Sequence, residues 1–513
     1  MVRVRTDIIR HISIYISEEM GIILRNTAFS PNIRDRLDYT CGVMDEYGNL
    51  LAQAEHIPVH IGSMSIGVRN TIDYLSSEGV ELRDGDVLIV NDPYIAGTHL
   101  NDILLITPVY LNNRLIAYIA SKAHHVDVGG KIPGSIGGDV ETLYDEGVVI
   151  KPRLLFRGGE VDRGLIELLK GSVRTPKYLI GDLYAQYTSL RLGRRRLMEM
   201  ADKYGVEAIR EAWREILDYS DKYVRRRISG LGVRGRFRAR DILEYRDMDL
   251  IISVEVNIRD DSMEIDFKGT SREVRAPINA VYGVTVASVS YTLKTILDPE
   301  LPINQGSMRA IKVRAEKGSL VNPNPPSPVS GGNLETSQRI VDTLYRALSN
   351  AYRGIVPAAS CGSMNNIVIG GDGWVFYETI GGGSGARPNG DGVDGVHTNM
   401  TNTLNTPIEV IEANYPILMT RYEFRDGSHG DGRYRGGLGL VRCFKLRRER
   451  AILTVLTSRV RYRPWGLNGG GEAMPNEYYV VKGGERIKLG SSLSSSSMDV
   501  DEPSLILLPP LTT

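Results

Sequence analysis

Histidine and aspartate side chains gather in two short stretches in the first quarter of the chain. Residues 91–102 contain Asp92, His99 and Asp102, and residues 124–130 contain His124, His125 and Asp127. Imidazole and carboxylate groups together can bind zinc, manganese or iron without any thiolate. The stretches therefore predict a metal site. A structural role fits the same spacing equally well, because an aspartate before proline also shapes turns and paired histidines also form hydrogen bonds at strand edges.

Spacing within the two stretches limits which side chains can converge. His99 and Asp102 are three residues apart and can lie on one side of a turn. If residues 124–127 are extended, His125 and Asp127 share one face while His124 points to the other. The two neighbouring histidines therefore cannot both bind one ion. One can be a ligand while the other orients a ligand or transfers a proton, and the spacing leaves open which.

A glycine-rich stretch at 381–386 fits a dinucleotide fingerprint but lacks its context. Gly381-Gly382-Gly383-Ser384-Gly385-Ala386 follows a strand-like run at 374–380. The next residues, Arg387-Pro388-Asn389-Gly390, are unsuited to opening the helix that would hold a pyrophosphate. The sequence also has no Gly-x-x-x-x-Gly-Lys-Ser/Thr motif. We therefore predict no nucleotide site here, and instead a segment that other backbone approaches closely at a site or an interface.

A second polar segment, residues 397–409, is dense in amide and hydroxyl side chains. Such a run can line a substrate site, or it can satisfy its own backbone in a long loop. The residues alone favour the loop.

Apolar periodicity predicts the elements around these stretches. Runs at 103–110 and 115–121 predict two strands joined through Asn112-Asn113, and the histidine and aspartate stretches flank this pair. The other elements predicted for this part are a strand at 87–91, a hairpin at 37–53, helices at 7–26 and 63–75, and two or three helices across 182–229.

Beyond Gly230-Leu231-Gly232, which ends the helical block, the pattern becomes richer in strands. It predicts strands at 248–256 and 262–267, helices at 276–296 and 335–350, and mostly strand and loop over 362–513. We expect a multi-domain α+β fold with a helix-rich N-terminal half and a β-rich C-terminal half. The predicted divisions are 1–230, which holds the histidine and aspartate stretches, 231–328 and 329–513.

Composition excludes several classes of protein. Hydrophobic residues make up 42% and charged residues 24%, as in ordinary globular chains. Lys+Arg and Asp+Glu both number 62, so there is no general attraction to nucleic acid or to an anionic membrane. Three distant cysteines, no signal peptide and no apolar run of about 18 residues predict a cytoplasmic protein. Glycine-rich loops and an apolar tail at 505–511 predict an oligomer.

Short segments spread along nearly the whole chain carry a resemblance to a known family. They are Leu37-Asp38-Tyr39-Thr40-Cys41 and residues 54–64, 91–102, 124–130, 133–135, 330–336, 364–366, 378–387, 401–412 and 435–439. Together they resemble the hydantoinase B / 5-oxoprolinase family. That family includes the B-type subunit of ATP-dependent hydantoinases, the C-terminal half of 5-oxoprolinase and the α subunit of acetone carboxylase.

The resemblance implies one half of a two-component enzyme and a set of site residues. An A-type partner would bind ATP and phosphorylate the substrate, which agrees with the missing phosphate loop here. A divalent metal (zinc, manganese or iron) would act as a Lewis acid. The implied metal ligands are Asp92, His99, Asp102 and His124, the implied catalytic residues are His125 and Asp127, and the implied substrate-binding residues are Asn333, Asn365 and Asn402.

The activity implied by the resemblance is hydrolysis of a small cyclic amide such as hydantoin, N-methylhydantoin or 5-oxoproline, after its phosphorylation on the A-type partner. Two alternatives stay open. The chain could be the α-type subunit of an ATP-dependent acetone or ketone carboxylase, or a non-catalytic scaffold for the A-type partner.

Overall fold

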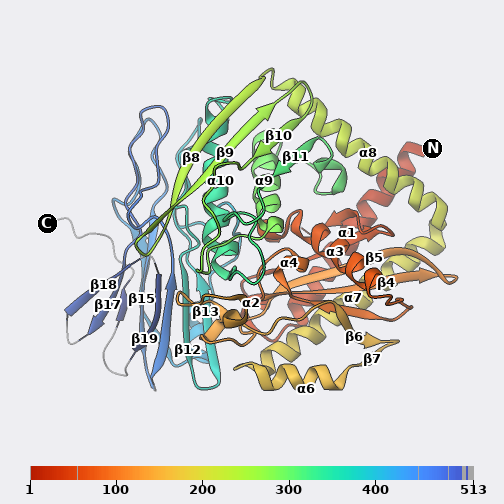
Figure 1. Ribbon diagram of the computed structural model, residues 1–513, viewed down its shortest axis with the longest axis horizontal. Helices are drawn as coiled ribbons and strands as arrows, with labels where there is room; N and C mark the ends of the chain where they lie inside the picture. Colours follow the sequence, from red (N-terminus) through yellow and green to blue (C-terminus); the bar gives the residue numbers. More distant parts are fainter. Residues whose placement is uncertain are drawn as a thin grey trace.

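Four β-sheets and three long helices dominate the computed structural model over the residues it describes, which are 2–54, 56–448, 450–482, 485–490, 492–498 and 504–506. The chain runs from long helices and a large sheet on the right of Figure 1 to smaller sheets on the left. This arrangement confirms the α+β class. Helices are concentrated in the first half, whereas both halves contain strands, and the largest sheet lies in the first half.

The largest sheet carries the predicted histidine and aspartate stretches. It is antiparallel, with strand order β2-β1-β5-β4-β3-β6-β7. Its strands are β1 (Tyr39–Asp45), β2 (Leu50–Gln53), β3 (Val87–Val90), β4 (Asp102–Leu111), β5 (Arg114–His124), β6 (Arg153–Arg157) and β7 (Glu160–Val161). The β4–β5 hairpin turns at Asn112 and Asn113, whose φ angles of 50° and 59° suit a two-residue turn, as predicted.

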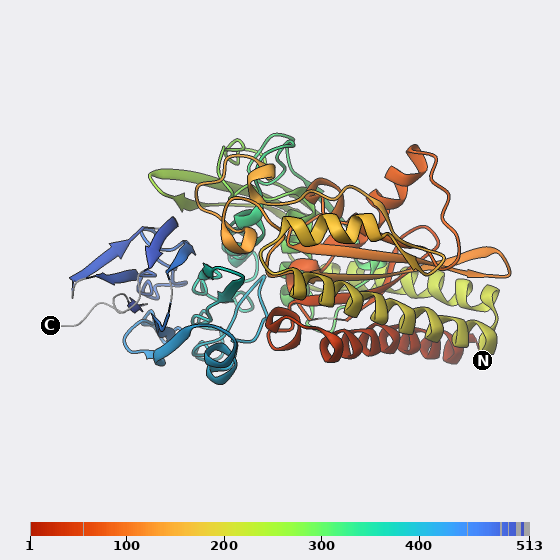
Figure 2. The ribbon, with the colours of Figure 1, turned by 90° about the horizontal axis from the view of Figure 1, so that it is seen from below.

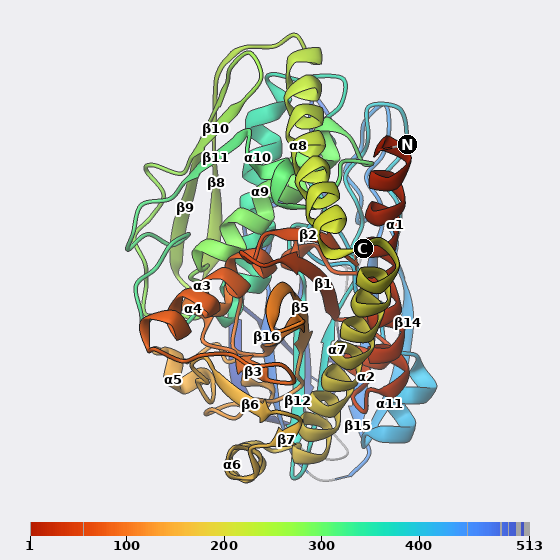
Figure 3. The ribbon, with the colours of Figure 1, turned by 90° about the vertical axis from the view of Figure 1, so that its right-hand side faces the viewer.

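Helices cover both faces of this sheet. The long helices α1 (Val2–Thr27), α7 (Pro176–Tyr204) and α8 (Val206–Gly230) lie side by side on one face (Figures 2 and 3). On the other face α3 (Ser63–Ser77) packs against the even-numbered side chains of β4 and β5. The short helices of this half are α2 (Pro31–Arg34), η1 (Pro58–His60), α4 (Pro93–Ala96), η2 (Pro133–Ser135), α5 (Leu143–Glu146) and α6 (Arg163–Ser172).

A four-stranded sheet with two helices forms the middle of the chain. The sheet order is β11-β10-β9-β8. The elements are β8 (Gly235–Tyr245), β9 (Met248–Ile258), β10 (Met263–Asp266), α9 (Tyr282–Leu297), η3 (Gln305–Met308), β11 (Ile311–Arg314), η4 (Gly332–Thr336) and α10 (Ser337–Ser349).

The helix predicted at 276–296 begins later than expected, so the predicted start was wrong. Asn279 explains the difference, because its side-chain amide donates hydrogen bonds to the carbonyls of Val274, Ala276 and Pro328. These bonds fold the backbone before Tyr282 into a loop rather than a first helical turn.

Two sheets and one short helix make up the C-terminal part. Their elements are β12 (Asn366–Gly371), β13 (Trp374–Thr379), α11 (Ile408–Asn414), β14 (Ile417–Arg425), β15 (Gly439–Leu446), β16 (Ala451–Leu456), β17 (Tyr478–Lys482), β18 (Glu485–Leu489), β19 (Ser492–Met498) and β20 (Ser504–Ile506). The strand orders are β13-β12-β16-β19 and β14-β15-β20-β17-β18. Most of the polar run at 397–409 is a loop, as predicted, and α11 begins near its end.

The main hydrophobic core extends through all three predicted divisions. It contains Leu105 of β4, Val254 of β9 and Leu344 of α10, among many others. A separate core lies between the C-terminal sheets. The division at 230 and 328 stays a prediction. Of the predicted apolar tail, residues 507–511 lie outside the described part of the chain. No described helix is both long enough and apolar enough for a membrane span.

Candidate metal centre

The sheet brings two of the predicted ligands together directly. Asp102 opens β4 and His124 closes β5, and the two residues are register partners across the hairpin. His99 lies in the turn that follows α4. Asp102 Oδ1 lies 3.0 Å from His99 Nε2 and 3.3 Å from His124 Nδ1, and the two ring nitrogens are 3.1 Å apart. A metal with bonds of about 2.1 Å places neighbouring ligand atoms about 3.0–3.4 Å apart, so these separations fit.

The three side chains are buried, and their converging donor atoms are of the types that bind divalent metals. His99, Asp102 and His124 are each no more than 2% exposed. Two imidazole nitrogens and one carboxylate oxygen are ligands that zinc, manganese and iron accept. The buried His-Asp-His group could therefore hold a metal ion.

Contacts outside the group orient its two imidazoles. His99 Nδ1 lies 3.3 Å from the carbonyl oxygen of Ser330, to which it can donate. The lone pair of His99 then sits on Nε2, toward Asp102. The ring of His124 stacks on Tyr377 of β13, with centroids 5.0 Å apart and planes at 17°. The group thus lies where the large sheet meets the segment at 330 and the C-terminal sheet.

Charge around the group favours an anionic aspartate. Burial alone would raise the pKa of Asp102, but His99, His124 and His60 offset this and hold that pKa well below its usual range. Burial would lower the pKa of His99, whereas the adjacent Asp102 carboxylate raises it above its usual value. A carboxylate kept ionised in a buried site is the state that a cation requires.

Lys122 supports the loop that carries His99. It is fully buried on β5, two residues before His124, and its Nζ donates to the carbonyl of Ala96 at 2.8 Å and to Thr98 Oγ1 at 3.3 Å. Burial lowers its pKa to about 8, although the Asp102 carboxylate acts in the opposite direction.

Two further residues beside the group were not predicted from the sequence. His60 Nε2, on η1, lies 3.3 Å from Asp102 Oδ2, while its Nδ1 contacts Thr40 Oγ1 at 3.0 Å. Asp38 Oδ2 lies 3.9 Å from His124 Nδ1. Both residues fall inside segments that carry the family resemblance, but they are about 40 to 90 positions away in sequence from the side chains they approach.

The remaining predicted metal and catalytic residues point elsewhere. Asp92 caps α4 by accepting from the backbone nitrogen of Tyr94.

His125 lies on the opposite face of the sheet from His124, and its Nε2 is 3.0 Å from Gln186 Oε1 on α7. Asp127 accepts hydrogen bonds from the backbone nitrogens of Gly129 and Gly134, and it pairs with Arg174. The alternation expected for residues 124 and 125 is present, with His124 on the side of the group.

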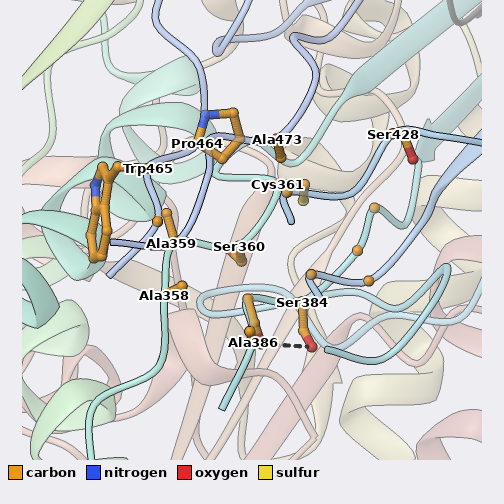
Figure 4. Close-up of a pocket in the computed structure, with 18 of the residues that line it drawn as sticks. Ala358, Ala359, Ser360, Cys361, Ser384, Ala386, Ser428, Pro464, Trp465 and Ala473 are labelled. Carbon is orange, nitrogen blue, oxygen red and sulfur yellow. Dashed lines mark hydrogen bonds between the residues drawn. The ribbon is translucent and has the colours of Figure 1, made fainter. Parts of the chain in front are cut away.

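The three predicted substrate-binding asparagines are spread over different surroundings. Asn365 lines a cavity of about 570 Å³, and Asn402 lines a second cavity of about 500 Å³. The two cavities share Ser360 and Ser384 as lining residues. Figure 4 shows the first cavity, with Cys361, Ser360 and Ser384 around it. Asn333 lies outside both sets of lining residues and is buried before α10.

The stretch beside the first cavity needs glycine, because other backbone approaches it too closely for a side chain. A Cβ on Gly383 would lie 1.8 Å from the carbonyl oxygen of Gly437, and one on Gly385 would lie 1.9 Å from that of Ala358. Residues 386–392 form a turn rather than a helix. The prediction of a closely approached backbone segment is confirmed.

Similar proteins extend over nearly the whole chain. A family model described as Hydantoinase B/oxoprolinase matches residues 3–507. The protein MJ0963 of Methanocaldococcus jannaschii is 52% identical, covering 95% of this chain and 86% of that protein. The putative B-type subunit of a D-/L-hydantoinase from a Pseudomonas species is 32% identical, covering 89% of this chain and 80% of that protein. 5-Oxoprolinase 1 of Arabidopsis thaliana is 36% identical over 95% of this chain, which spans only 40% of that protein.

Two solved structures share the fold. The ATP-dependent caprolactamase from Pseudomonas jessenii has a TM-score of 0.90 and 25% identity, covering 98% of this chain and 89% of that one. The nucleotide-free structure of acetone carboxylase also has a TM-score of 0.90, with 19% identity over 98% of this chain and 74% of that one. The resemblance drawn from short motifs is confirmed along the sequence: the chain belongs to the Hydantoinase B/oxoprolinase family.

Proposed function

We propose that this chain is the B-type component of an ATP-dependent cyclic amide hydrolase. Its substrate would be a hydantoin, an N-methylhydantoin or 5-oxoproline, activated by phosphorylation on an A-type partner. The observation that carries the proposal is the buried His99, Asp102 and His124 group, whose donor atoms converge with the spacing of metal ligands.

The relatives support a division of labour between two polypeptide parts. One relative is named as the B-type subunit of a hydantoinase, which implies at least one other polypeptide in that enzyme. The plant 5-oxoprolinase is much longer than the region that this chain matches. The caprolactamase, which shares the fold, is ATP-dependent by name and acts on a lactam. An ATP-binding partner would supply what the glycine-rich stretch here does not.

Amide resonance explains why two steps are needed. The carbonyl carbon of a lactam is a poor electrophile, and phosphorylation of the carbonyl oxygen converts that oxygen into part of a leaving group. The chain must then position the activated substrate and one water and exclude other water. His99, Asp102 and His124 would hold a divalent metal, which would supply Lewis-acid stabilisation of negative charge on oxygen.

Other side chains would bind the substrate or hold the loops around the metal site. Asn365 and Asn402 border the two cavities that share lining residues, and from there their amides can contact a substrate. Asn333 keeps an unpaired buried amide oxygen among the described residues and is proposed as a third amide contact. His125 and Asp127 would act on the centre through the strand and loop that they hold, because their contacts lie away from it.

The test combines metal analysis with turnover by the complex. The chain, co-purified with its A-type partner, should contain a divalent metal and should hydrolyse one of the cyclic amides only with ATP. His99→Ala and Asp102→Asn should each lose the metal, and the turnover of each variant should fall at least about 100-fold. Asp92→Asn, which keeps the α4 cap, should lose neither. Cyclic amide hydrolysis by this chain alone, without ATP, would refute the proposal.

The same preparation separates the two alternatives. A ketone carboxylase would incorporate labelled bicarbonate into an acetoacetate-like product when given acetone and ATP. A scaffold would leave the activity of the complex intact in the double variant His99→Ala with Asp102→Ala. Either result would replace the hydrolase assignment.

A further inference from the structure

We propose that Glu146 is a positioning residue for the metal centre, acting through the backbone at Val329 and Ser330. The proposal rests on the metal-binding function proposed for His99, Asp102 and His124. It concerns a side chain that the resemblance does not single out and that lies at the end of the short helix α5.

Three hydrogen bonds connect Glu146 to His99. Glu146 is 1% exposed, and its Oε1 accepts from the backbone nitrogens of Val329 at 2.9 Å and Ser330 at 2.8 Å. The carbonyl oxygen of the same Ser330 lies 3.3 Å from His99 Nδ1. One carboxylate oxygen therefore fixes the residue whose carbonyl sets the ring orientation of a proposed ligand.

The backbone after Ser330 is fixed from the other side. Gly332 donates its backbone N–H to the carbonyl of Pro277 at 3.0 Å. A Cβ on Gly332 would lie 1.8 Å from the carbonyl oxygen of Asn279, so the two backbones touch. Ser330 is thus held between Glu146 and the loop that precedes α9, and its carbonyl has little freedom to turn away from His99.

Glu146 is itself held by the loop that contains Asp127. The backbone nitrogen of Lys131 donates to the carbonyl of Asp145 at 2.9 Å, and that of Val148 donates to the carbonyl of Val128, also at 2.9 Å. Gly130 has a φ of 81°, and a Cβ there would lie 2.5 Å from the carbonyl oxygen of Asp145. The Asp127 carboxylate holds this loop in place by accepting hydrogen bonds from the backbone nitrogens of Gly129 and Gly134. The segment after His124 therefore helps to position Glu146.

Removing the Glu146 oxygen should weaken metal binding without removing a ligand. Groups that orient metal-bound histidines typically account for 10–100-fold in metal affinity. Glu146→Ala should therefore bind Zn²⁺ at least about 10-fold more weakly. Glu146→Gln keeps an oxygen that can accept from both backbone nitrogens, so its affinity should stay within about 3-fold of the parent protein.

Glu244 offers a matched control on β8. It is also 1% exposed, and its Oε1 accepts from two consecutive backbone nitrogens, those of Val460 at 2.6 Å and Arg461 at 3.4 Å. Glu244→Ala removes the same kind of buried contact at a place with no hydrogen bond to Ser330 or His99 in the described structure. Its Zn²⁺ affinity should match that of the parent protein.

The experiment measures Zn²⁺ affinity by chelator competition on the full-length chain and compares the visible absorption of the Co²⁺ form. Support requires weaker Zn²⁺ binding and an altered Co²⁺ spectrum in Glu146→Ala, with Glu146→Gln and Glu244→Ala close to the parent. Parent-like binding in Glu146→Ala, or an equal loss in Glu244→Ala, overturns the proposal. If Glu146→Ala does not fold, Glu146→Asp is used instead. Parent-like Zn²⁺ affinity in Glu146→Asp would also overturn the proposal.

His99→Ala separates this inference from the proposed function. If His99→Ala loses Zn²⁺ while Glu146→Ala keeps it, only the positioning of His99 by Glu146 is wrong. If His99→Ala binds Zn²⁺ as the parent does, the metal centre itself is wrong and the positioning falls with it.

Discussion

Among single residues, Glu335 illustrates how burial controls a carboxyl group outside the candidate metal centre. It is 1% exposed in η4, just before α10, and it accepts hydrogen bonds from the backbone nitrogen of Met364 and from the Asn366 amide. Burial raises its pKa from 4.5 to about 7. Since the native state holds the proton more tightly, this group favours folding at low pH, and that contribution is lost as the pH rises toward 7.

We therefore expect Glu335→Gln to reduce the loss of stability between pH 5 and pH 8. The shift corresponds to about 3 kcal/mol, because one pKa unit is worth about 1.4 kcal/mol. Denaturant unfolding of both proteins at pH 5, 6, 7 and 8 measures the difference. Parallel stability curves for the parent and the variant would contradict the assigned shift.

The structure brings together those predicted ligands that one hairpin connects. His99, Asp102 and His124 lie within 26 positions, and residue chemistry marked them. His60 and Asp38 were missed, because only the pairing of β1 with β5 and the packing of η1 bring them close. The contact between the Ser330 carbonyl and His99 could not be predicted for another reason. Every residue has a backbone carbonyl, so the residue type at 330 does not indicate that its carbonyl contacts His99.

At the scale of elements, α3 must approach the loop before His99 very closely. A Cβ on Gly67 would lie 2.4 Å from the carbonyl oxygen of Ala96, which already accepts from Lys122. Gly67→Ala would therefore push the helix from the loop, although alanine is the better helix former by about 1 kcal/mol. We expect a net destabilisation of about 1–2 kcal/mol.

Gly171 on α6 is the matched control for this prediction. Nothing lies within 4 Å of a Cβ placed on it. Gly171→Ala should therefore stabilise the protein by up to about 1 kcal/mol. Opposite signs in thermal unfolding of the two variants would support the close approach of α3, and stabilisation of both would contradict it.

Elements were predictable where their apolar pattern was strong. The hairpins and the long helices follow alternation and helical periodicity closely. Strand β8 was not predicted, because it is an edge strand whose first half is exposed and arginine-rich and carries few apolar side chains. The late start of α9 depends on Asn279 contacts to three carbonyls, one of them 49 positions away, and no local pattern records those contacts.

For the whole molecule, a buried ion-pair cluster joins the N-terminal part to the C-terminal sheets. Glu378 of β13 lies 3.5 Å from Arg36 Nε and 2.9 Å from Arg442 Nη1, and all three side chains are fully buried. Arg36 also donates to the carbonyl of Tyr377, whose ring stacks on His124. The cluster therefore lies next to the candidate metal centre.

Glu378→Ala should destabilise the protein by about 3–5 kcal/mol, because it leaves two buried guanidinium groups without their carboxylate. Chemical denaturation measures the loss. The control is Glu207→Ala, which removes the exposed partner of Arg114 and should cost less than about 1 kcal/mol. Similar small losses in both variants would show that the cluster contributes little to holding the two parts together.

The order in which the centre can be completed follows from Ser330. His99 and His124 leave the ribosome early, but the carbonyl that orients His99 belongs to a residue 231 positions later. A growing chain shorter than this would carry the proposed ligands without their alignment. If the centre binds metal as proposed, we expect the metal to bind late in synthesis, after most of the polypeptide has been translated.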